Sequence, residues 1–420
     1  MRTNHSRRTA VTATASALAL ALVGCSSGGD EDAADPEGSG GVTTVTFAAS
    51  TFGDPGRGPL LLELVDEFNS SQDEIRVSAA AVPYPTFGQT VLTQMGSGLG
   101  PDLIRFDMPE FASASEAGLV TPLDDYIDVE EYDLLQQPDQ FMVHDGVRHG
   151  VIFEASNYGM FYNADLIPEP PTTFEEFVQT AEELTEGDTF GLAFRQTQEE
   201  EAGVWQDIFN YVYGFGGAWS DGEELTINRA ENVEGLEAYQ SLYDAEVIPR
   251  GADAATFRRM FAEGKVGMEL NNGGYVSATQ GQAPDLNFSV APIPFPVRAQ
   301  GTILAPIVIN EASPAKEAAA TFIEWVLQPE NQVKLQEILG ASSVATVTER
   351  SPETLEETPF LTVFDELTDT SLPHVVLGFE SRTPDIRKIV VENVLASLQG
   401  EVSMQEALDR AQDEATALVG

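Results

Sequence analysis

The sequence predicts an α/β protein built as two lobes, and two observations carry this prediction. Short apolar runs, typical of buried strands, alternate with helical stripes across the first part of the chain. Such alternation favours mostly parallel sheets flanked by helices. Of the 420 residues, about 380 remain after a leader and a polar segment, which is too long for one small core and suits two lobes.

The first 25 residues have the pattern of a lipoprotein signal peptide. A basic start with three arginines precedes the apolar run 11–23, which is too short to span a membrane. The run ends in LVGC, which resembles the lipobox of bacterial lipoproteins, where the cysteine thiol takes the lipid. Cys25 is the only cysteine in the chain, so a disulfide within one chain is excluded.

The folded part is expected to begin with alternating strands and helices. The expected elements up to residue 106 are strands 42–49, 75–82 and 102–106 and helices 60–68 and 87–95. After residue 184 we expect strands 190–195, 288–294 and 302–310 and helices 205–213, 233–245, 257–261, 315–327 and 386–398. A final helix is predicted to be capped by Ser403 with Glu406.

A stretch in the middle of the chain has the pattern of a crossing between lobes. Residues 151–153 form an apolar strand pattern, which should end at the polar and small residues 154–157. The aromatic-rich run 158–162 resumes an extended pattern, and the prolines that follow exclude a helix there. Thr172, with Glu175 three residues later, is predicted to cap the next helix.

This order resembles the extracellular solute-binding proteins of ABC importers, in particular the sugar-binding branch that is similar to maltose-binding protein. In that family the chain enters the second lobe through a YN-x-D-(L/I)…P-x-T-(W/F)-x-E segment. Its counterparts here are Tyr162, Asn163, Asp165, Leu166, Pro171, Thr173, Phe174 and Glu176. Residues 96–104 and 261–275 resemble two further family segments, with Tyr275 at the usual tryptophan position of the second. The resemblance covers essentially the whole mature chain.

The resemblance implies a two-lobed, periplasmic-binding-protein-like fold, in which each lobe is a mostly parallel sheet flanked by helices and a hinge joins the two. The expected divisions are a signal peptide at 1–25, a flexible tether at 26–41, lobe one at 42–153, lobe two at 154–270, a return to lobe one at 271–312, and C-terminal helices mainly on lobe two at 313–420. The tether assignment rests on composition, because residues 26–41 have almost no apolar content to bury.

The resemblance also implies a ligand, expected to be a carbohydrate, in a cleft that closes by hinge motion. Aromatic rings match the apolar faces of a sugar, while carboxylates and amides match its hydroxyls. The candidate ligand-binding residues are Phe52, Phe106, Asp107, Glu154, Asn157, Trp205, Asn272, Tyr275, Phe379, Glu380 and Arg382. For each aromatic the alternative is core packing, and for Arg382 it is a pair with a surface acid.

The expected function is that of a monomeric, lipid-anchored binding protein on the outer face of the cytoplasmic membrane, which delivers its ligand to an ABC permease. No cofactor, metal or catalytic residue is expected, because the G-x-S-x-G, H-E-x-x-H and Walker patterns are absent from the sequence. Two alternatives stay open: a secreted glycan-cleaving lipoprotein that uses two carboxylates, and a binder of another solute such as a polyamine or a metal chelate.

The charge balance is strongly acidic, with 68 acidic and 21 basic residues and a net charge of −47. Nucleic acid is not expected as a partner, because phosphate binding needs basic patches. The acidic residues are dispersed through ordinary sequence, which indicates a solvated surface. Self-repulsion of this size is tolerated where salt is high, so a saline habitat is expected, and the alternative is an ordinary acidic secreted protein.

The first prediction concerns the anchor. We expect the Cys25→Ser variant to leave the membrane fraction while its folded domain keeps the melting temperature of the mature protein, since no other thiol can take the lipid. Detergent partition of whole cells checks this. Continued membrane association of the variant would contradict the lipoprotein assignment.

The second prediction concerns salt. Because screening relieves repulsion between like charges, the melting temperature of the folded domain is expected to rise as NaCl increases from low to molar concentration. Thermal melts across a NaCl series measure this, and a flat or falling curve would remove the basis for a saline habitat.

Overall fold

The computed structural model describes residues 41–54, 56–83, 86–144 and 146–420. The predicted signal peptide, Cys25 and nearly all of the predicted tether lie outside the described residues. Within these ranges, no helix has both the length and the apolar character needed to cross a membrane.

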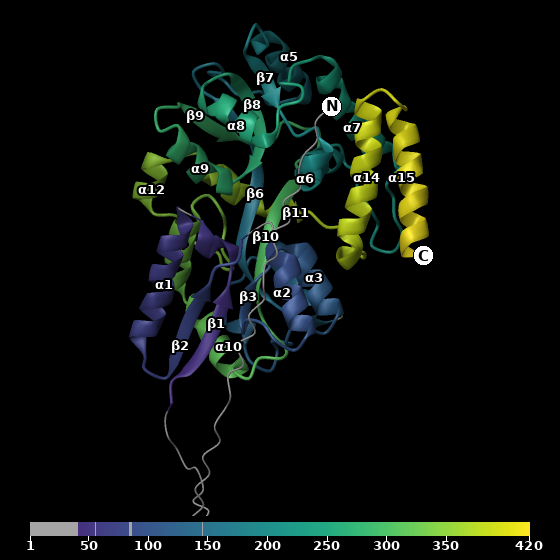
Figure 1. Ribbon diagram of the computed structural model, residues 1–420. Helices are drawn as coiled ribbons and strands as arrows, with labels where there is room; N and C mark the ends of the chain where they lie inside the picture. Colours follow the sequence, from purple (N-terminus) through teal and green to yellow (C-terminus); the bar gives the residue numbers. More distant parts are fainter. Residues whose placement is uncertain (1–40, 55, 84–85, 145) are drawn as a thin grey trace, which may run out of the picture. The chain divides into compact units, whose positions relative to one another are not determined.

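A nine-stranded sheet runs through the described chain, in the order β2-β1-β3-β10-β6-β8-β7, with β11 beside β10 and β9 beside β6 (Figure 1). Its strands are β1 Thr43–Ala48, β2 Ile75–Ala80, β3 Leu103–Arg105, β6 Val151–Asn163, β7 Phe190–Ala193, β8 Val266–Asn272, β9 Phe288–Ala291, β10 Gln300–Ile309 and β11 Ser371–Pro373. A separate two-stranded sheet pairs β4 Val143–His144 with β5 Val147–Arg148.

The strand directions in the large sheet are mixed. Strand β1 is parallel to β2 and β3, as the alternation of strands and helices predicts. Strand β10 is antiparallel to β3 and β6, and β6 is antiparallel to β8 and β9. The long strands β6 and β10 pass from one half of the sheet to the other in opposite directions, which produces this mixture (Figure 1). The two-lobed α/β class is therefore confirmed, with mixed pairing in each half.

Helices cover the sheet in each half (Figure 1). They are α1 Arg57–Ser71, α2 Phe87–Gly96, α3 Met108–Glu116, α4 Gln136–Asp139, α5 Phe174–Leu184, α6 Glu201–Gly214, α7 Ala230–Asp244, α8 Ala254–Ala262, α9 Gly274–Gln282, α10 Lys316–Val326, α11 Pro329–Leu339, α12 Pro352–Glu357, α13 Leu361–Glu366, α14 Thr383–Leu398 and α15 Met404–Val419. The predicted capping box of the last helix is confirmed, since Ser403 and Glu406 exchange side-chain and backbone hydrogen bonds. Helix α5 begins one residue later than predicted, because Thr173 and not Thr172 accepts the N–H of Glu176.

Buried apolar side chains form two large cores and a smaller third one. The first core joins β1, β3 and α1 to the start of β6 and the end of β10. The second core joins the later part of β6 to α6, α7, α14 and α15. The third cluster includes Phe161, Phe257, Phe261, Tyr275 and Phe364. Along β6, Ala155 belongs to the first core and Tyr158 to the second, so the strand passes between them at residues 156–157.

The C-terminal segment 313–420 divides between the two cores. The expectation that it lies mainly on lobe two is wrong for α10 and α11, because Phe322 and Leu335 pack in the first core. Helices α14 and α15 pack in the second core. A helical stripe predicts that a face is buried, but not which sheet it covers. Helix α10 follows the first-core end of β10 after a short connection, so it packs on the nearer sheet.

Strand β6 continues through residues 154–157, where the sequence predicts a strand end. All thirteen residues of β6 are buried, and 154–157 pair with β10 in an antiparallel register. The polar side chains in this stretch bind residues that are distant in sequence. Asn157 donates from Nδ2 to the carbonyl of Phe364 at 2.8 Å and to Oγ1 of Thr368 at 2.9 Å. Because these partners satisfy them, the polar groups can be buried inside a strand.

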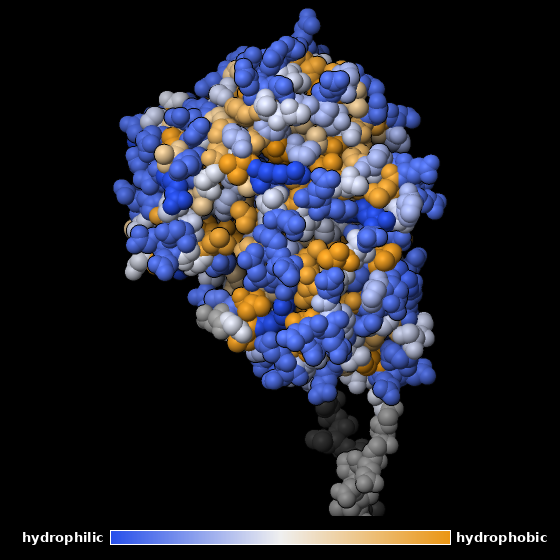
Figure 2. All heavy atoms as spheres, turned by 180° about the vertical axis from the view of Figure 1, so that it is seen from behind, coloured by the Kyte–Doolittle hydropathy of each residue, from blue (hydrophilic) through white to orange (hydrophobic). Residues whose placement is uncertain are grey.

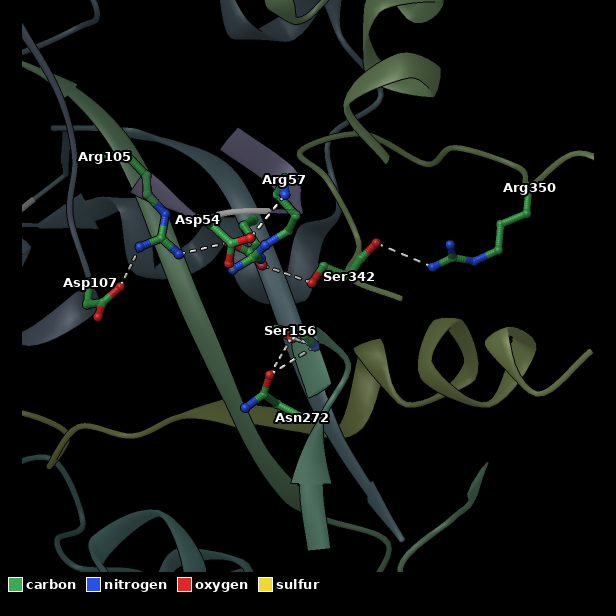
Figure 3. A network of polar contacts seen from close by, with 10 residues as sticks. Asp54, Arg57, Arg105, Asp107, Ser156, Asn272, Ser342 and Arg350 are labelled. Carbon is green, nitrogen blue, oxygen red and sulfur yellow. Dashed lines mark hydrogen bonds and ion pairs between the residues drawn. The ribbon is translucent and has the colours of Figure 1, made fainter. Parts of the chain in front are cut away.

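Glu154 is the centre of the largest polar cluster on β6. Arg57 Nη1 donates to one carboxylate oxygen at 3.0 Å and Arg105 Nη2 to the other at 2.8 Å, while the Ser342 hydroxyl lies 3.0 Å from the first oxygen. Figure 3 shows Arg57, Arg105 and Ser342 converging from separate parts of the chain. Burial by itself would raise the pKa of Glu154, but Arg105 and Arg57 lower that pKa by more, so the carboxylate stays charged.

The exposed surface is mainly hydrophilic. Figure 2 shows polar and charged residues over most of the face that it draws, with apolar residues in separate patches. Exposed large apolar side chains, such as Leu60, Leu99 and Val347, are scattered along the sequence. This arrangement fits the dispersed acidic residues, which the sequence predicts to form a solvated surface.

The third prediction concerns Glu154. Replacing it in the Glu154→Gln variant leaves two guanidinium groups without a full counter-charge, so the free energy of unfolding at neutral pH should fall by about 3 kcal/mol or more. Because the folded-state pKa of Glu154 is lowered, its contribution is present above the unfolded pKa and is lost as pH falls through the folded pKa. The difference between wild type and variant should therefore shrink in acid.

Urea unfolding at a series of pH values measures this difference. The control is Glu263→Gln, which removes an exposed 2.7 Å pair with Lys265 and should leave the unfolding midpoint unchanged. Equal stability of wild type and Glu154→Gln at neutral pH would show that the buried cluster contributes nothing.

Candidate functional site

A cavity of about 610 Å³ lies between the two large cores. The wall on the first core comes from the 3-10 turn Ser50–Gly53, the start of α1 and the end of β3. The opposite wall comes from the starts of α6 and α9 and from α8, and the crossing strands β6, β8 and β10 complete the lining. Its polar and aromatic side chains are Ser50, Thr51, Asp54, Arg57, Arg105, Asp107, Glu154, Ser156, Gln206, Arg258, Asn271, Asn272 and Tyr275.

Four of the residues predicted from the sequence line this cavity: Asp107, Glu154, Asn272 and Tyr275. Asp107 accepts from Arg105 at 2.8 Å, so Arg105 links Asp107 to Glu154 (Figure 3). Asn272 Oδ1 accepts from the Ser156 hydroxyl at 3.1 Å and from the Gly274 N–H at 3.0 Å. Residues that are distant in the sequence therefore meet in one polar lining.

Four other predicted residues are buried outside this cavity. Phe52 packs edge-on against Phe47 at 5.2 Å, and Phe106 lies fully buried in the same core. Trp205 stacks on Trp219 at 4.9 Å and lines only a neighbouring recess, while Asn157 is held by its two hydrogen bonds inside the fold. Phe52, Phe106 and Trp205 therefore pack in the core, which is the alternative that the sequence left open for each aromatic residue.

Strand geometry explains why Phe106 and Asp107 differ. Successive side chains of an extended chain point to opposite sides, so Arg105 and Asp107 share one side and Phe106 takes the other. Arg105 and Asp107 line the cavity, whereas Phe106 packs against Phe87 in the first core. The positions after β3 therefore supply the cavity with charges and the core with an aromatic ring.

The last three predicted residues, Phe379, Glu380 and Arg382, line a different cavity of about 460 Å³ beside α3. Glu380 accepts from the Gly378 N–H at 2.9 Å. Arg382 lies 3.8 Å from Asp385 and donates to the carbonyl of Leu418, which matches the alternative of pairing with a surface acid. None of the three belongs to the lining of the larger cavity.

Tyr275 lies in the first turn of α9. It is 6% exposed, and its ring packs edge-on against Phe161 at 5.2 Å while also lining the cavity. The Arg258 guanidinium carbon lies 5.1 Å from the ring centre. Burial, with Glu269 beside it, raises the pKa of Tyr275, so the hydroxyl is neutral. The ring of Tyr275 therefore packs in the third cluster and also forms part of the cavity wall.

Sequence reasoning missed the three cavity arginines, Arg57, Arg105 and Arg258. Arg105 ends a predicted strand, and the alternation of side chains there could have placed it beside Asp107. Arg57 follows the loop after the first strand, which is also a favoured position for a ligand contact. Arg258 carries no such signal, because the pattern of α8 shows only the apolar spacing of Phe257 and Phe261.

The arrangement is suited to hydrogen bonding and not to metal binding. Carboxylate and amide oxygens accept hydrogen bonds, while guanidinium and amide N–H groups donate them. Within the residues that the structure describes, no group of three or more His, Cys, Asp or Glu side chains could hold a metal ion. The cavity volume is in the range of small-ligand sites, and among the described residues one aromatic ring and many polar groups line it.

Several proteins resemble this chain in sequence or fold. A putative binding protein of Brucella abortus is 24% identical over 320 residues, covering 71% of this chain and 74% of the relative. The maltotriose-binding protein of Pyrococcus abyssi is 26% identical over 286 residues, covering 64% and 60%. In the first comparison about three quarters of the relative is matched, so the similarity extends beyond a single motif.

Solved structures share the fold. The GacH receptor of Streptomyces glaucescens, solved unliganded and with acarbose, has a TM-score of 0.77 at 20% identity, covering 90% of this chain and 98% of that one. The cyclic α-maltosyl-1,6-maltose binding protein of Arthrobacter globiformis has a TM-score of 0.77 at 22% identity, covering 90% and 99%. Likeness at these identities establishes the two-lobed fold.

The family assignment rests on the sequence match. Residues 63–360 match the family described as bacterial extracellular solute-binding protein. The matched region begins in α1 and ends just before α13, so it includes the second-core wall of the 610 Å³ cavity and the end of β3 on the first-core wall. The turn Ser50–Gly53 and Arg57 precede it. Because the match covers well over half of the chain, this protein belongs to the bacterial extracellular solute-binding proteins.

Proposed function

We propose that this protein captures a carbohydrate in the 610 Å³ cavity and delivers it to the permease of an ABC importer. The observation that carries the proposal is the lining between the two cores, where Tyr275 stands among hydrogen-bonding groups such as Asp107, Glu154 and Asn272. A ring face matches the C–H face of a sugar, and ionised or amide oxygens match its hydroxyls. The relatives named for maltotriose, acarbose and a cyclic maltose derivative support the same class of ligand.

The crossing strands support a closing motion. Strands β6 and β10 pass between the two cores, and β8 pairs with β6 beyond the crossing. Small backbone changes at such a crossing move two rigid bodies about a hinge. We assign the hinge to the part of β6 from Glu154 to Asn157, where the strand leaves one core and enters the other. The first core and its helices then form lobe one, and the other two clusters form lobe two.

The proposal includes the lipid anchor. Cys25 would carry the lipid, residues 26–41 would be the tether, and the two lobes would work as a monomer at the outer face of the cytoplasmic membrane. The lipobox-like LVGC and the polar composition that follows it support this part. A solute captured near the membrane has a short path to a permease.

Glycan cleavage has less support from the cavity. A glycosidase needs a carboxyl with a raised pKa as its general acid. Burial would raise the pKa of Asp54 and Glu154, but hydrogen bonds and nearby arginines lower both by more. Burial and Asp107 do raise the pKa of Glu110 to about 7, but Glu110 lies in a recess of about 100 Å³. Glu110 therefore stands outside the lining of the 610 Å³ cavity in which a sugar is proposed to bind.

A thermal-shift screen of the mature protein against mono- and oligosaccharides tests the proposed function. A carbohydrate that binds the folded state raises the melting temperature in proportion to its concentration and affinity. The protein should return that carbohydrate unchanged after long incubation. Turnover of a glycoside would instead support the enzyme alternative, and a shift only with polyamines or metal chelates would support a different solute.

The fourth prediction compares two aromatic residues. Tyr275→Ala should weaken carbohydrate binding by about tenfold or more, because it removes the ring from the cavity wall. Tyr275→Phe keeps the ring and should retain most of the affinity. Phe379→Ala, in the separate cavity beside α3, should change affinity by less than about twofold.

Calorimetric titration well below the melting temperature measures the three affinities. Tyr275→Ala should also lower the melting temperature of the unliganded protein, because the ring packs against Phe161. If the variant is less stable but binds as tightly as wild type, Tyr275 is a core residue only and the stacking role is wrong.

A further inference from the structure

We infer that the ligand of this cavity is an anionic carbohydrate, and that Arg258 binds its anionic group. This inference rests on the proposed function, because it names the class of carbohydrate for the same site. Three observations support it: the position of Arg258, its lack of a bonded partner among the described residues, and the distribution of charge between the two walls.

Arg258 stands at the cavity with its charge unpaired. It lines the second-lobe wall, and it makes no hydrogen bond or ion pair with any residue that the structure describes. Its Nε is shielded from solvent and has no acceptor among those residues. Its guanidinium carbon lies over the ring of Tyr275, 5.1 Å from the ring centre. A guanidinium presents five N–H donors, so this group is left with unused donors at a binding surface.

Arg258 differs from the other described arginines in being partly buried without an ion pair. Among the arginines that the structure describes, Arg76, Arg229, Arg258 and Arg410 lack an ion pair, and of these only Arg258 is not solvent-exposed. Acidic residues outnumber basic ones by 68 to 21 in the whole chain, so carboxylate partners are abundant. A partly buried guanidinium without a partner in such a chain indicates that its acceptor comes from outside.

The buried carboxyl of Glu269 does not supply the missing charge in full. Glu269 on β8 attracts Arg258, and their attraction lowers the pKa of Glu269 to some extent. Burial is the larger effect and raises that pKa to about 7, so the carboxyl is partly protonated near neutral pH. Glu269 is also 1% exposed and does not line the cavity, so it does not occupy the space in which a ligand would contact Arg258.

The two walls differ in charge, and this difference sets the orientation of the ligand. On the first-lobe side and β6, the carboxylates of Asp54, Asp107 and Glu154 accompany Arg57 and Arg105, which gives two positive and three negative charges, a net of −1. These five groups already pair with one another. On the second-lobe wall, Arg258 is the only lining residue with a formal charge among those that the structure describes. An anionic group is therefore attracted to Arg258, while the sugar hydroxyls face the carboxylates and amides opposite.

Two helices begin on the same wall as Arg258. Ala202 and Gly203 of α6 and Gly274 and Tyr275 of α9 line the cavity, and neither helix has a side-chain cap at its N-terminus. The N-terminal end of a helix carries a partial positive charge. The start of α9, which has no acidic residue in its first turn, therefore adds to the attraction that Arg258 exerts on an anion. At the start of α6, Glu201 offsets the partial charge of the helix.

The net charge of −47 does not prevent this binding. Charges on the outer surface are screened beyond a Debye length of about 8 Å at physiological ionic strength, and over shorter distances in stronger salt. Groups in direct contact inside a cavity are screened much less. The ligand therefore responds mainly to the groups that line the site.

The test compares acidic and neutral sugars that differ in one group. The mature protein is screened by thermal shift and then titrated calorimetrically with glucuronate against glucose, galacturonate against galactose, maltobionate against maltose, and glucose 6-phosphate. We expect an acidic probe to bind at least about tenfold more tightly than its neutral counterpart. The uronate, aldonate and phosphate probes separate a carboxylate from a phosphate as the anionic group.

The variants are Arg258→Gln and Arg258→Lys, with Arg250→Gln as the matched control. Arg250 also lies over a tyrosine, 4.3 Å from the ring centre of Tyr243, but it is outside the cavity. Arg258→Gln should weaken the acidic probe by about tenfold and the neutral probe by less than about twofold. Arg258→Lys should lie between wild type and Arg258→Gln, and Arg250→Gln should alter neither affinity. Melts of the unliganded variants confirm that each one is folded.

The outcomes separate the two proposals. If neutral sugars bind as tightly as their acidic counterparts, or if Arg258→Gln weakens both equally, the anionic inference is wrong and the proposed carbohydrate-binding function stands. If neither acidic nor neutral carbohydrates bind, both are wrong. A preference for acidic probes that disappears in Arg258→Gln supports both.

Discussion

The ion cluster around Glu154 fixes strand β6 to the first core at the point where the chain passes between the two cores. The carboxylate binds Arg57 of α1, Arg105 of β3 and Ser342 beyond α11, three parts of the first lobe that are far apart in sequence. Glu154 itself stands on β6, which continues into the second core. The first-lobe wall of the cavity therefore has a defined position relative to the strand that leads out of it.

The same cluster determines what the first wall can offer a ligand. Because Arg57 and Arg105 already bind carboxylates of the wall, their charges are largely used within the protein. The remaining acceptor capacity of Asp107 and Glu154, together with the amide of Asn272, suits hydroxyl groups. The second wall instead carries a positive charge, because the guanidinium of Arg258 lies over the ring of Tyr275 without an ion pair among the described residues. Helices α6 and α9 also begin there without a side-chain cap. A ligand with hydroxyls along one side and an anionic group on the other matches both walls.

Tyr275 shows how one residue can serve stability and binding together. Its ring packs against Phe161 and also lines the cavity, with Arg258 over its face. A ring fixed by core packing presents its surface without a further loss of side-chain freedom on binding. The small third cluster thus gives rigidity to the wall that carries the free charge.

The sequence alone determined the features that depend on neighbouring residues. The alternation of strands and helices, the capping box of Ser403 and Glu406 and the family resemblance all come from short continuous patterns. Tyr275 and Asp107 were also found this way, since each follows a strand. Tertiary structure decided the features that depend on distant partners: the unbroken course of β6, the packing of α10 on the first core, and the burial of Phe106 and Trp205. The physical reason is that a polar residue such as Glu154 is stable inside a strand only when Arg57, 97 positions away, binds it, and no local pattern records such a pairing.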